Sequence, residues 1–245
     1  MEKRIKPELL RKLLHLLFSI LLLAPLTPYY KSLFITSSHQ TFDPTLITYA
    51  TLTFVVAVIN SVQIKVQNLE TVIASIVGEH RKRLLDYASQ SFEATPLSEF
   101  LKNMDKIISK LEKQLLSLID NVKRDYERRY GYISITFTLL SILLSYVIWG
   151  EDTYVGILAL ALIDGVAGIV TIIDTKSRKV FKHTITAYIT SFLLFTFVLY
   201  ITTQNMLLSL VTCLIALIIE SISPEDNLTL PFITTTTFSI LKNAL

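Results

Sequence analysis

Charged residues are scarce in this chain. Asp, Glu, Lys and Arg make up 18% of its 245 residues, against about 25% in an ordinary soluble domain. Hydrophobic residues reach 51%, and the mean hydropathy is +0.53. This composition excludes intrinsic disorder and is not typical of a soluble globular protein. Cysteine is scarcer still, because Cys213 is the only one, which excludes a disulfide framework and a cysteine-based zinc site. The net charge of +3 is too small to indicate nucleic-acid binding.

The scarce charges are also unevenly distributed, and several long stretches contain almost none. A membrane-spanning helix needs roughly 20 mostly apolar residues because the hydrocarbon core is about 30 Å thick. Backbone polar groups in lipid must be bonded within the segment, which favours helices. The 37-residue stretch His183–Ile219 is long enough for two passes. We therefore expect an all-α membrane bundle of about seven helices, the last one short. The expected spans lie in 13–30, 44–64, 130–150, 153–173, 183–219 (two passes) and 227–241.

The basic residues predict how these helices are oriented. With seven spans, 21 of the 23 Lys and Arg residues fall on one side of the membrane, and Lys31 and Lys242 fall on the other. Basic residues near the ends of spans favour the cytoplasm. We expect an integral protein of the plasma membrane or an internal membrane, with its N-terminus in the cytoplasm.

The segment 63–129 differs in kind and separates the first two spans (1–62) from the remaining bundle (130–245). It is highly charged and has apolar residues at heptad spacing, which indicates paired helices. Pro96 lies in the expected turn, Ser89–Ser98. We expect an antiparallel cytoplasmic hairpin that acts as a spacer or a dimerisation element, so the sequence leaves a homo-oligomer open. The heptad positions are Ile73, Val77, His80, Leu84 and Tyr87, then Leu101, Met104, Ile108, Leu111, Leu115, Leu118 and Val122.

One carboxylate, Asp164, falls in the middle of an expected span. Gly165, Ala167 and Gly168 surround it, and such small residues allow a helix or a ligand to approach closely. A charged group within a membrane needs a partner and is by default a functional candidate. Mg²⁺ is one such partner, because it binds a few carboxylates together with substrate phosphates. A structural pair with a Lys or Arg is the alternative.

Cationic residues begin the first expected helix and follow the fourth. Arg11 and His15 are four residues apart and share a helix face with Lys12 beside them, so they suit phosphate oxygens. They equally suit an anchor of the positive-inside type. The loop after the fourth helix has the same two interpretations, orientation signal or headgroup contact. Its basic residues are Lys176, Arg178, Lys179 and Lys182.

An acidic turn separates the last two expected spans. Glu220 ends one span, and Asp226 and Asn227 begin the next. Either of these two residues can cap the last helix, whose N–H groups then favour an anion.

Together these motifs resemble the dolichol kinase, phytol kinase and CTP-dependent diacylglycerol kinase family over residues 8–30 and 130–235. That family begins its first helix with Arg-Lys-x-x-His, has a later Asp among small residues followed by a basic loop, and ends in Glu and Asp-Asn-Leu-x-x-Pro. Ile163 stands where the family usually has Gly. The matching residues are Arg11, Lys12 and His15, then Asp164, Ala167, Gly168 and Lys182, then Glu220, Asp226, Asn227, Leu228 and Pro231.

The resemblance implies transfer of the γ-phosphate of CTP to the hydroxyl of a membrane isoprenoid alcohol, at the cytoplasmic face and with Mg²⁺. Phytol, geranylgeraniol and diacylglycerol are alternative acceptors, and a transporter or membrane scaffold without enzymatic activity is an alternative of another class. The implied roles are catalysis and metal binding by Asp164 and Asp226, catalysis by Glu220, and nucleotide binding by Arg11, Lys12, His15, Lys182 and Asn227.

Overall fold

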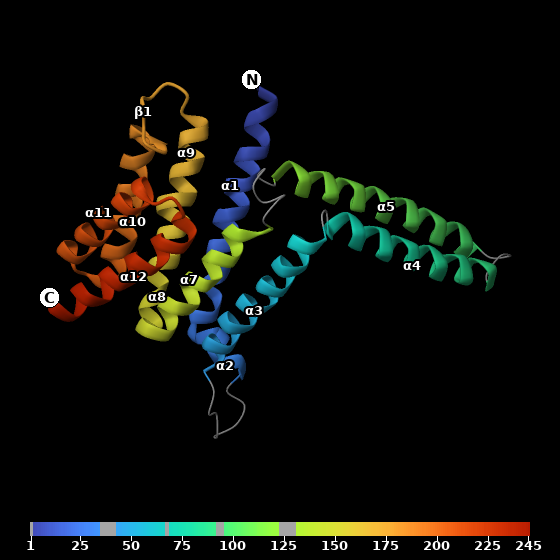
Figure 1. The fold of residues 1–245 in the computed structure, drawn as a ribbon, viewed down its shortest axis with the longest axis horizontal. Coiled ribbons are helices and arrows are strands. Elements are labelled where there is room, and N and C mark those ends of the chain that lie inside the picture. The colour runs from blue at the N-terminus through green and yellow to red at the C-terminus, as the bar shows by residue number, and fades with distance from the viewer. Residues whose placement is uncertain (1, 35–42, 67–68, 92–95, 123–130) are drawn as a thin grey trace. The chain divides into compact units, whose positions relative to one another are not determined.

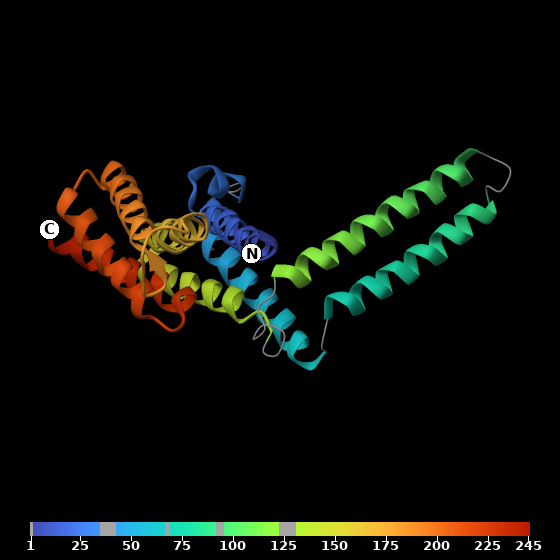
Figure 2. The same ribbon diagram turned by 90° about the horizontal axis from the view of Figure 1, so that it is seen from above.

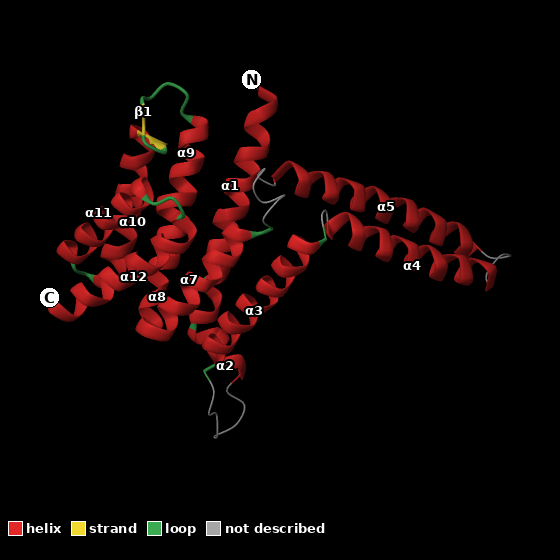
Figure 3. Cartoon of the chain, viewed as in Figure 1, coloured by secondary structure: helices red, strands yellow, loops and turns green. Residues whose placement is uncertain are grey.

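The computed structural model describes residues 2–34, 43–66, 69–91, 96–122 and 131–245. These residues are almost entirely helical (Figure 3), so the expected all-α class is confirmed. The chain forms two compact units. Unit 1 comprises residues 1–58 and 132–245, and unit 2 comprises residues 59–131. The expected boundary at 129–130 lies outside the described residues.

Unit 1 is a bundle of helices joined by short connections (Figure 1). The N-terminus of α1 and the strand β1 lie at the same end of this bundle (Figure 1). Its elements are α1 (Glu2–Leu22), η1 (Ala24–Leu26), α2 (Pro28–Phe34), α3 (Pro44–Lys65), α7 (Ile133–Trp149), η2 (Gly150–Asp152), α8 (Thr153–Ala159), η3 (Leu160–Val166), α9 (Ala167–Ile173), β1 (Lys179–Val180), β2 (His183–Thr184), α10 (Ile185–Thr203), α11 (Met206–Ile222) and α12 (Asp226–Ala244).

Four segments among the described residues are long and apolar enough to cross a membrane: Pro7–Leu26, Pro44–Lys65, Ile133–Ile173 and Ile185–Thr203. This is consistent with a membrane-embedded protein. The third segment has 41 residues, or about 60 Å of helix, which is twice the hydrocarbon thickness. It is interrupted at Gly150, whose φ of 56° ends α7. The chain then returns through α8, η3 and α9 toward the end of unit 1 where β1 lies (Figure 1).

The core of unit 1 lies where α12 packs on α7, α8 and α11. The approach of α8 to α12 depends on Gly156, because a Cβ there would lie 2.3 Å from the carbonyl oxygen of Pro231. Pro231 itself lies inside α12, which continues through it. Buried Ser and Thr residues are frequent in this core, as expected where small and hydroxyl side chains mediate helix contacts in a membrane.

Two local features of unit 1 depart from simple α-helix and loop. The segment η3 is π-helical, and the basic loop folds back as a two-stranded antiparallel hairpin that pairs Lys179 with Thr184 and Val180 with His183. The left-handed conformation of Phe181, with φ of 52°, allows the tight reversal. Thr184 then caps α10 by accepting the N–H of Ala187. The hairpin therefore fixes the positions of Lys182 and His183.

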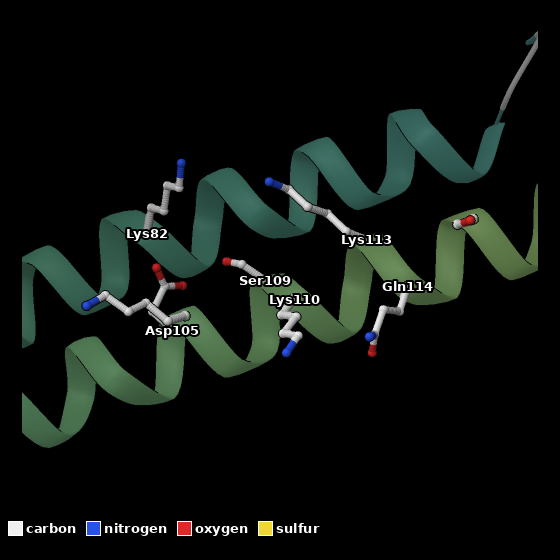
Figure 4. Close-up of a pocket in the computed structure, with 8 residues that line it drawn as sticks. Lys82, Asp105, Ser109, Lys110, Lys113 and Gln114 are labelled. Atoms are coloured by element: carbon white, nitrogen blue, oxygen red, sulfur yellow. The ribbon is translucent and has the colours of Figure 1, made fainter.

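Unit 2 consists mainly of α4 (Leu69–Ser91) and α5 (Pro96–Val122), which lie side by side and run in opposite directions (Figures 1 and 2). Residues 92–95 of the expected turn lie outside the described residues. A groove of about 970 Å³ follows the two helices (Figure 4). Its lining is mainly polar and basic: Lys82, Asp105, Lys106, Ser109, Lys110, Lys113, Gln114 and Ser117.

Candidate functional site

The candidate site begins at Asp164, which lies in the π-helical segment η3 and is only 5% exposed. A π-helical turn inserts an extra residue into a helix and is frequently found at functional sites. The segments before and after η3, α8 and α9, are ordinary α-helix. The irregular turn therefore coincides with the one carboxylate of the segment Thr153–Ile173.

Two side chains of α1 converge on this carboxylate. Lys12 Nζ donates a hydrogen bond to Asp164 Oδ1, and His15 Nε2 lies 3.0 Å from Asp164 Oδ2. Gly168, one helical turn beyond Asp164, makes room for the lysine, because a Cβ at this position would lie 2.5 Å from Lys12 Cε. The glycine is thus required for the Lys12–Asp164 ion pair as it stands.

His183 and Glu220 lie on the other side of Asp164, and one ligand atom from each of the three residues falls within 4.8 Å of the others. His183 Nε2 is 3.3 Å from Glu220 Oε1. The second ring nitrogen, Nδ1, is 3.0 Å from Thr171 Oγ1, so α9 fixes the orientation of the ring. Glu220 comes from the last turn of α11 and its side chain is 1% exposed.

Lys182 extends the cluster toward solvent. Its Nζ is 2.9 Å from Asp226 Oδ2, at the start of α12, and 3.9 Å from Glu220 Oε1. The site therefore joins α1, η3, the β1–β2 hairpin, α11 and α12 through alternating acids and bases. Three carboxylates face two lysines and two histidines in this group.

Burial and neighbouring charges shift the pKa values of His183 and Lys182. Burial lowers the pKa of His183 to about 4, so its ring is neutral at pH 7. Burial alone would lower the pKa of Lys182, but the hydrogen bond that Lys182 donates to Asp226 and the charge of Glu220 raise this pKa overall. Lys182 is thus a permanent cation at the site.

Asp174 organises the loop that carries these residues. Its Oδ1 accepts the backbone N–H of Lys176 and of Ser177 at 3.0 and 3.1 Å, and its Oδ2 accepts the hydroxyl of Thr186. A hydrogen bond from the Ser177 side chain contributes most, and together with these bonds it holds the pKa of Asp174 well below its usual range.

The donor set suits a divalent cation. Glu220 Oε2 is buried and has no hydrogen-bond partner among the described residues, a costly state for an isolated oxygen. Two ligands on opposite sides of a metal with bonds of about 2.1 Å lie about 4.2 Å apart. The span of 4.8 Å thus requires adjustments of only a few tenths of an ångström. Asp164, His183 and Glu220 are the residues that fit such an ion.

Six of the eight residues singled out from the sequence lie in this group: Lys12, His15, Asp164, Lys182, Glu220 and Asp226. Arg11 is half-buried on α1 next to Lys12. Asn227 is buried, and its Oδ1 lies 3.5 Å from Thr138 Oγ1 of α7. Its backbone N–H donates a hydrogen bond to Asp226 Oδ1 at 2.8 Å, which helps to orient the Asp226 carboxylate.

Sequence reasoning missed His183 as a site residue. In the sequence His183 is only the first residue of the long apolar stretch 183–219. Its place directly after the basic Lys182, at the junction of a charged loop and an apolar helix, was the available signal. Its partner Thr171 gave no signal, since a hydroxyl in an apolar span usually bonds its own helix.

Compared with known proteins, the chain matches no family model, no curated protein and no solved structure.

Proposed function

We propose that this protein is a membrane lipid kinase that transfers the γ-phosphate of CTP to the hydroxyl of an isoprenoid alcohol such as a polyprenol. The observation that carries the proposal is the continuous cluster in which Lys12 and Lys182 are each bound to a carboxylate. Beside it lies Glu220 Oε2, which has no hydrogen-bond partner in the described part of the chain. Phosphoryl transfer needs positioned cations and charge neutralisation more than covalent chemistry. The resemblance of the sequence motifs supplies CTP as donor and the lipid alcohol as acceptor.

The two ion pairs suggest how a nucleotide enters. Phosphate oxygens compete with carboxylates for lysine, so a triphosphate that binds Lys12 and Lys182 releases Asp164 and Asp226. Arg11 and His15 add positive charge beside Lys12, and Asn227 keeps Asp226 in place. A released carboxylate can then accept the proton of the attacking hydroxyl, the role of a general base.

A divalent ion fits the same cluster. Asp164 and Glu220, with His183, would hold it, and Mg²⁺ is the ion that carboxylates and nucleotide phosphates commonly share. When bound, it would neutralise the charge of the phosphates. Asp226, which the motif suggested as a second metal ligand, lies outside this group of three and contacts Lys182. We therefore assign Asp226 to holding Lys182 at the phosphate site and to proton transfer.

The proposed topology has seven passes, formed by α1, α3, α7, α8–α9, α10, α11 and α12. The turn at Gly150 supports counting the 41-residue segment as two passes, and the basic residues support a cytoplasmic N-terminus, hairpin and site. Asp164 lies nine residues before Ile173, so about 14 Å below the end of its span. That depth suits contact with phosphates or a lipid hydroxyl better than recognition of the base.

The decisive assay uses the purified full-length protein, radiolabelled CTP and a panel of alcohols comprising a polyprenol, phytol, geranylgeraniol and diacylglycerol. We expect a radiolabelled lipid monophosphate that requires Mg²⁺ and forms faster with CTP than with ATP. Equal or faster turnover with ATP would contradict the assignment of the donor. Absence of both nucleotide binding and lipid phosphorylation in a folded preparation would favour the transporter or scaffold.

Two lysines of one loop provide a matched pair of variants. Lys182→Gln removes the cation that contacts Asp226 and Glu220, whereas Lys179→Gln changes an exposed lysine of the same hairpin. A charge-assisted hydrogen bond contributes about 1.5–3 kcal/mol, so we expect the KM for CTP to rise roughly 10-fold or more in the first variant. It should stay within about twofold in the second. Equal effects would indicate that Lys182 acts only through the overall charge of the loop.

A further inference from the structure

A polar network joins the two helices of unit 2. Arg81 of α4 donates to Asp105 at 2.8 Å, to Ser109 at 2.9 Å and to Glu112, all on α5. This network occupies the middle of the described interface between the two helices. Among the heptad positions whose side chains the structure describes, Ile108 alone is half-buried, and the others are exposed.

Large apolar side chains of both helices remain outside this contact. They are between 39% and 76% exposed, although they recur at the three- and four-residue spacing of a coiled-coil seam. They are Ile73, Val77, Leu84 and Tyr87 on α4, and Met104, Ile107, Leu111 and Leu115 on α5.

These residues lie on one common face of the hairpin. On α5 an exposed apolar residue comes directly before a residue of the contact, as Leu111 comes before Glu112. On α4 the exposed Leu84 likewise comes directly before the half-buried Leu85, one helical turn beyond Arg81. One residue corresponds to a rotation of about 100°, so each apolar row is turned from the contact by the same angle in the same sense. Because the two helices run in opposite directions, this rotation places both apolar rows on the same side of the hairpin. We call this side the apolar face.

The lysines lie on the opposite side. Lys82, Lys106, Lys110 and Lys113 each come directly after a residue of the contact, and all four line the groove in Figure 4. A hairpin that inserted its apolar face into a bilayer would turn these lysines away from the lipid headgroups, where basic side chains bind most favourably. Pairing with another protein surface leaves the groove in water. The charge distribution therefore favours a protein partner over a membrane.

We propose that the apolar face pairs with the same face of a second copy of this chain and forms a four-helix bundle with twofold symmetry. A 23-residue helix such as α4 is about 35 Å long, and two helices spaced 8–10 Å apart present a face about 20 Å wide. Pairing would bury roughly 700 Å² per copy, or about 1,400 Å² in total, within the range of stable specific interfaces. Heptad spacing on both helices matches a helical partner. This proposal is independent of the kinase activity.

The test counts subunits of the full-length protein, labelled with one fluorophore per chain and reconstituted into liposomes at low density. We expect two bleaching steps for the wild type and one step for Leu111→Glu, which places a charge on the apolar face. The matched control Lys113→Glu, on the groove side of the same helix, should keep two steps. Single steps for the wild type, or two steps for Leu111→Glu, would overturn the proposal. Val77→Glu provides the same test from α4 if the first variant does not fold.

A second measurement addresses the membrane alternative. Tyr87→Trp in a Trp149→Phe background gives one tryptophan, located on the apolar face, because Trp149 is the only natural one. In liposomes with brominated lipids we expect no quenching of its fluorescence, since the second copy covers it. Strong quenching would assign the apolar face to the bilayer and reject the dimer.

Discussion

Gly168 offers the sharpest test of the site, because it controls Lys12 without touching any other charged group. A Cβ on this residue would lie 2.5 Å from Lys12 Cε, 2.7 Å from Cδ and 3.0 Å from Nζ. Ordinary van der Waals separations between carbon atoms are about 3.5–4.0 Å. In Gly168→Ala the flexible end of the Lys12 side chain must therefore move by about 1 Å or more from its position beside Asp164.

The size of the effect follows from opposing terms. Breaking one side of a buried ion pair costs about 3–5 kcal/mol, and replacing a helical Gly by Ala returns up to about 1 kcal/mol. We expect a net loss of about 2–4 kcal/mol, which corresponds to a fall in Tm of roughly 4–16 °C for a chain of this size. The KM for CTP should also rise, because the displaced lysine no longer faces the phosphate site.

Gly165→Ala is the matched control. It makes the same change in the same helical region, but its Cβ would meet Leu160 O at 3.4 Å and Leu16 Cδ1 at 3.5 Å, which are ordinary contacts. We expect its Tm and KM to be close to the wild type.

A double variant gives a second check. In a Lys12→Met background, Gly168→Ala should have little further effect, because the side chain at position 12 that it displaces no longer carries a charge. Thermal unfolding in detergent and CTP kinetics measure both quantities. Equal behaviour of the two glycine variants, or full additivity with Lys12→Met, would refute the reasoning.

Three further predictions concern the site, the hairpin and the topology. Asp164→Asn should lower kcat by about 10²-fold or more, and near-normal turnover would remove Asp164 from catalysis. Deletion of 67–126 with a short linker should leave measurable kinase activity, because unit 2 forms a compact unit of its own; complete loss in a folded variant would place the hairpin in the site. Ser89→Cys in a Cys213→Ser background should resist an impermeant thiol reagent applied outside intact cells, and labelling would reverse the proposed orientation.

The sequence predicted the helices well because a membrane imposes a simple requirement. Charge-free runs near 20 residues had to become helices, and the observed bounds of α3 differ from the expected ones by one residue. The stretch 183–219 was long enough for two helices, and the structure divides it at Gln204, whose left-handed conformation ends α10. The residues of the acidic turn were predictable for the same reason, since charges collect where helices leave the membrane.

Features set by the mutual rotation of neighbouring elements could not be predicted from spacing alone. The heptad pattern identified α4 and α5 as partners of other helices, but it did not reveal that Arg81 would turn the apolar rows away from their shared contact. The β1–β2 hairpin is similar. Its pairing is only two residues long on each strand, too short to leave an alternating pattern, yet it determines where Lys182 and His183 point.

The π-helical turn at Asp164 explains why one mid-span carboxylate can contact groups from opposite sides of the bundle. In a regular α-helix, successive residues turn by about 100°, and a side chain faces one neighbour. The wider turn of η3 locally changes this rotation, at the point where Asp164 meets Lys12 and His15 on one side and lies near His183 and Glu220 on the other. Such a turn weakens the local backbone bonding. We therefore expect a π-helical turn only where the contacts of its side chains offset the weaker backbone bonding. For η3 these contacts lie in the candidate site, where Asp164 pairs with Lys12 and lies near Glu220 Oε2, an oxygen without a hydrogen-bond partner among the described residues.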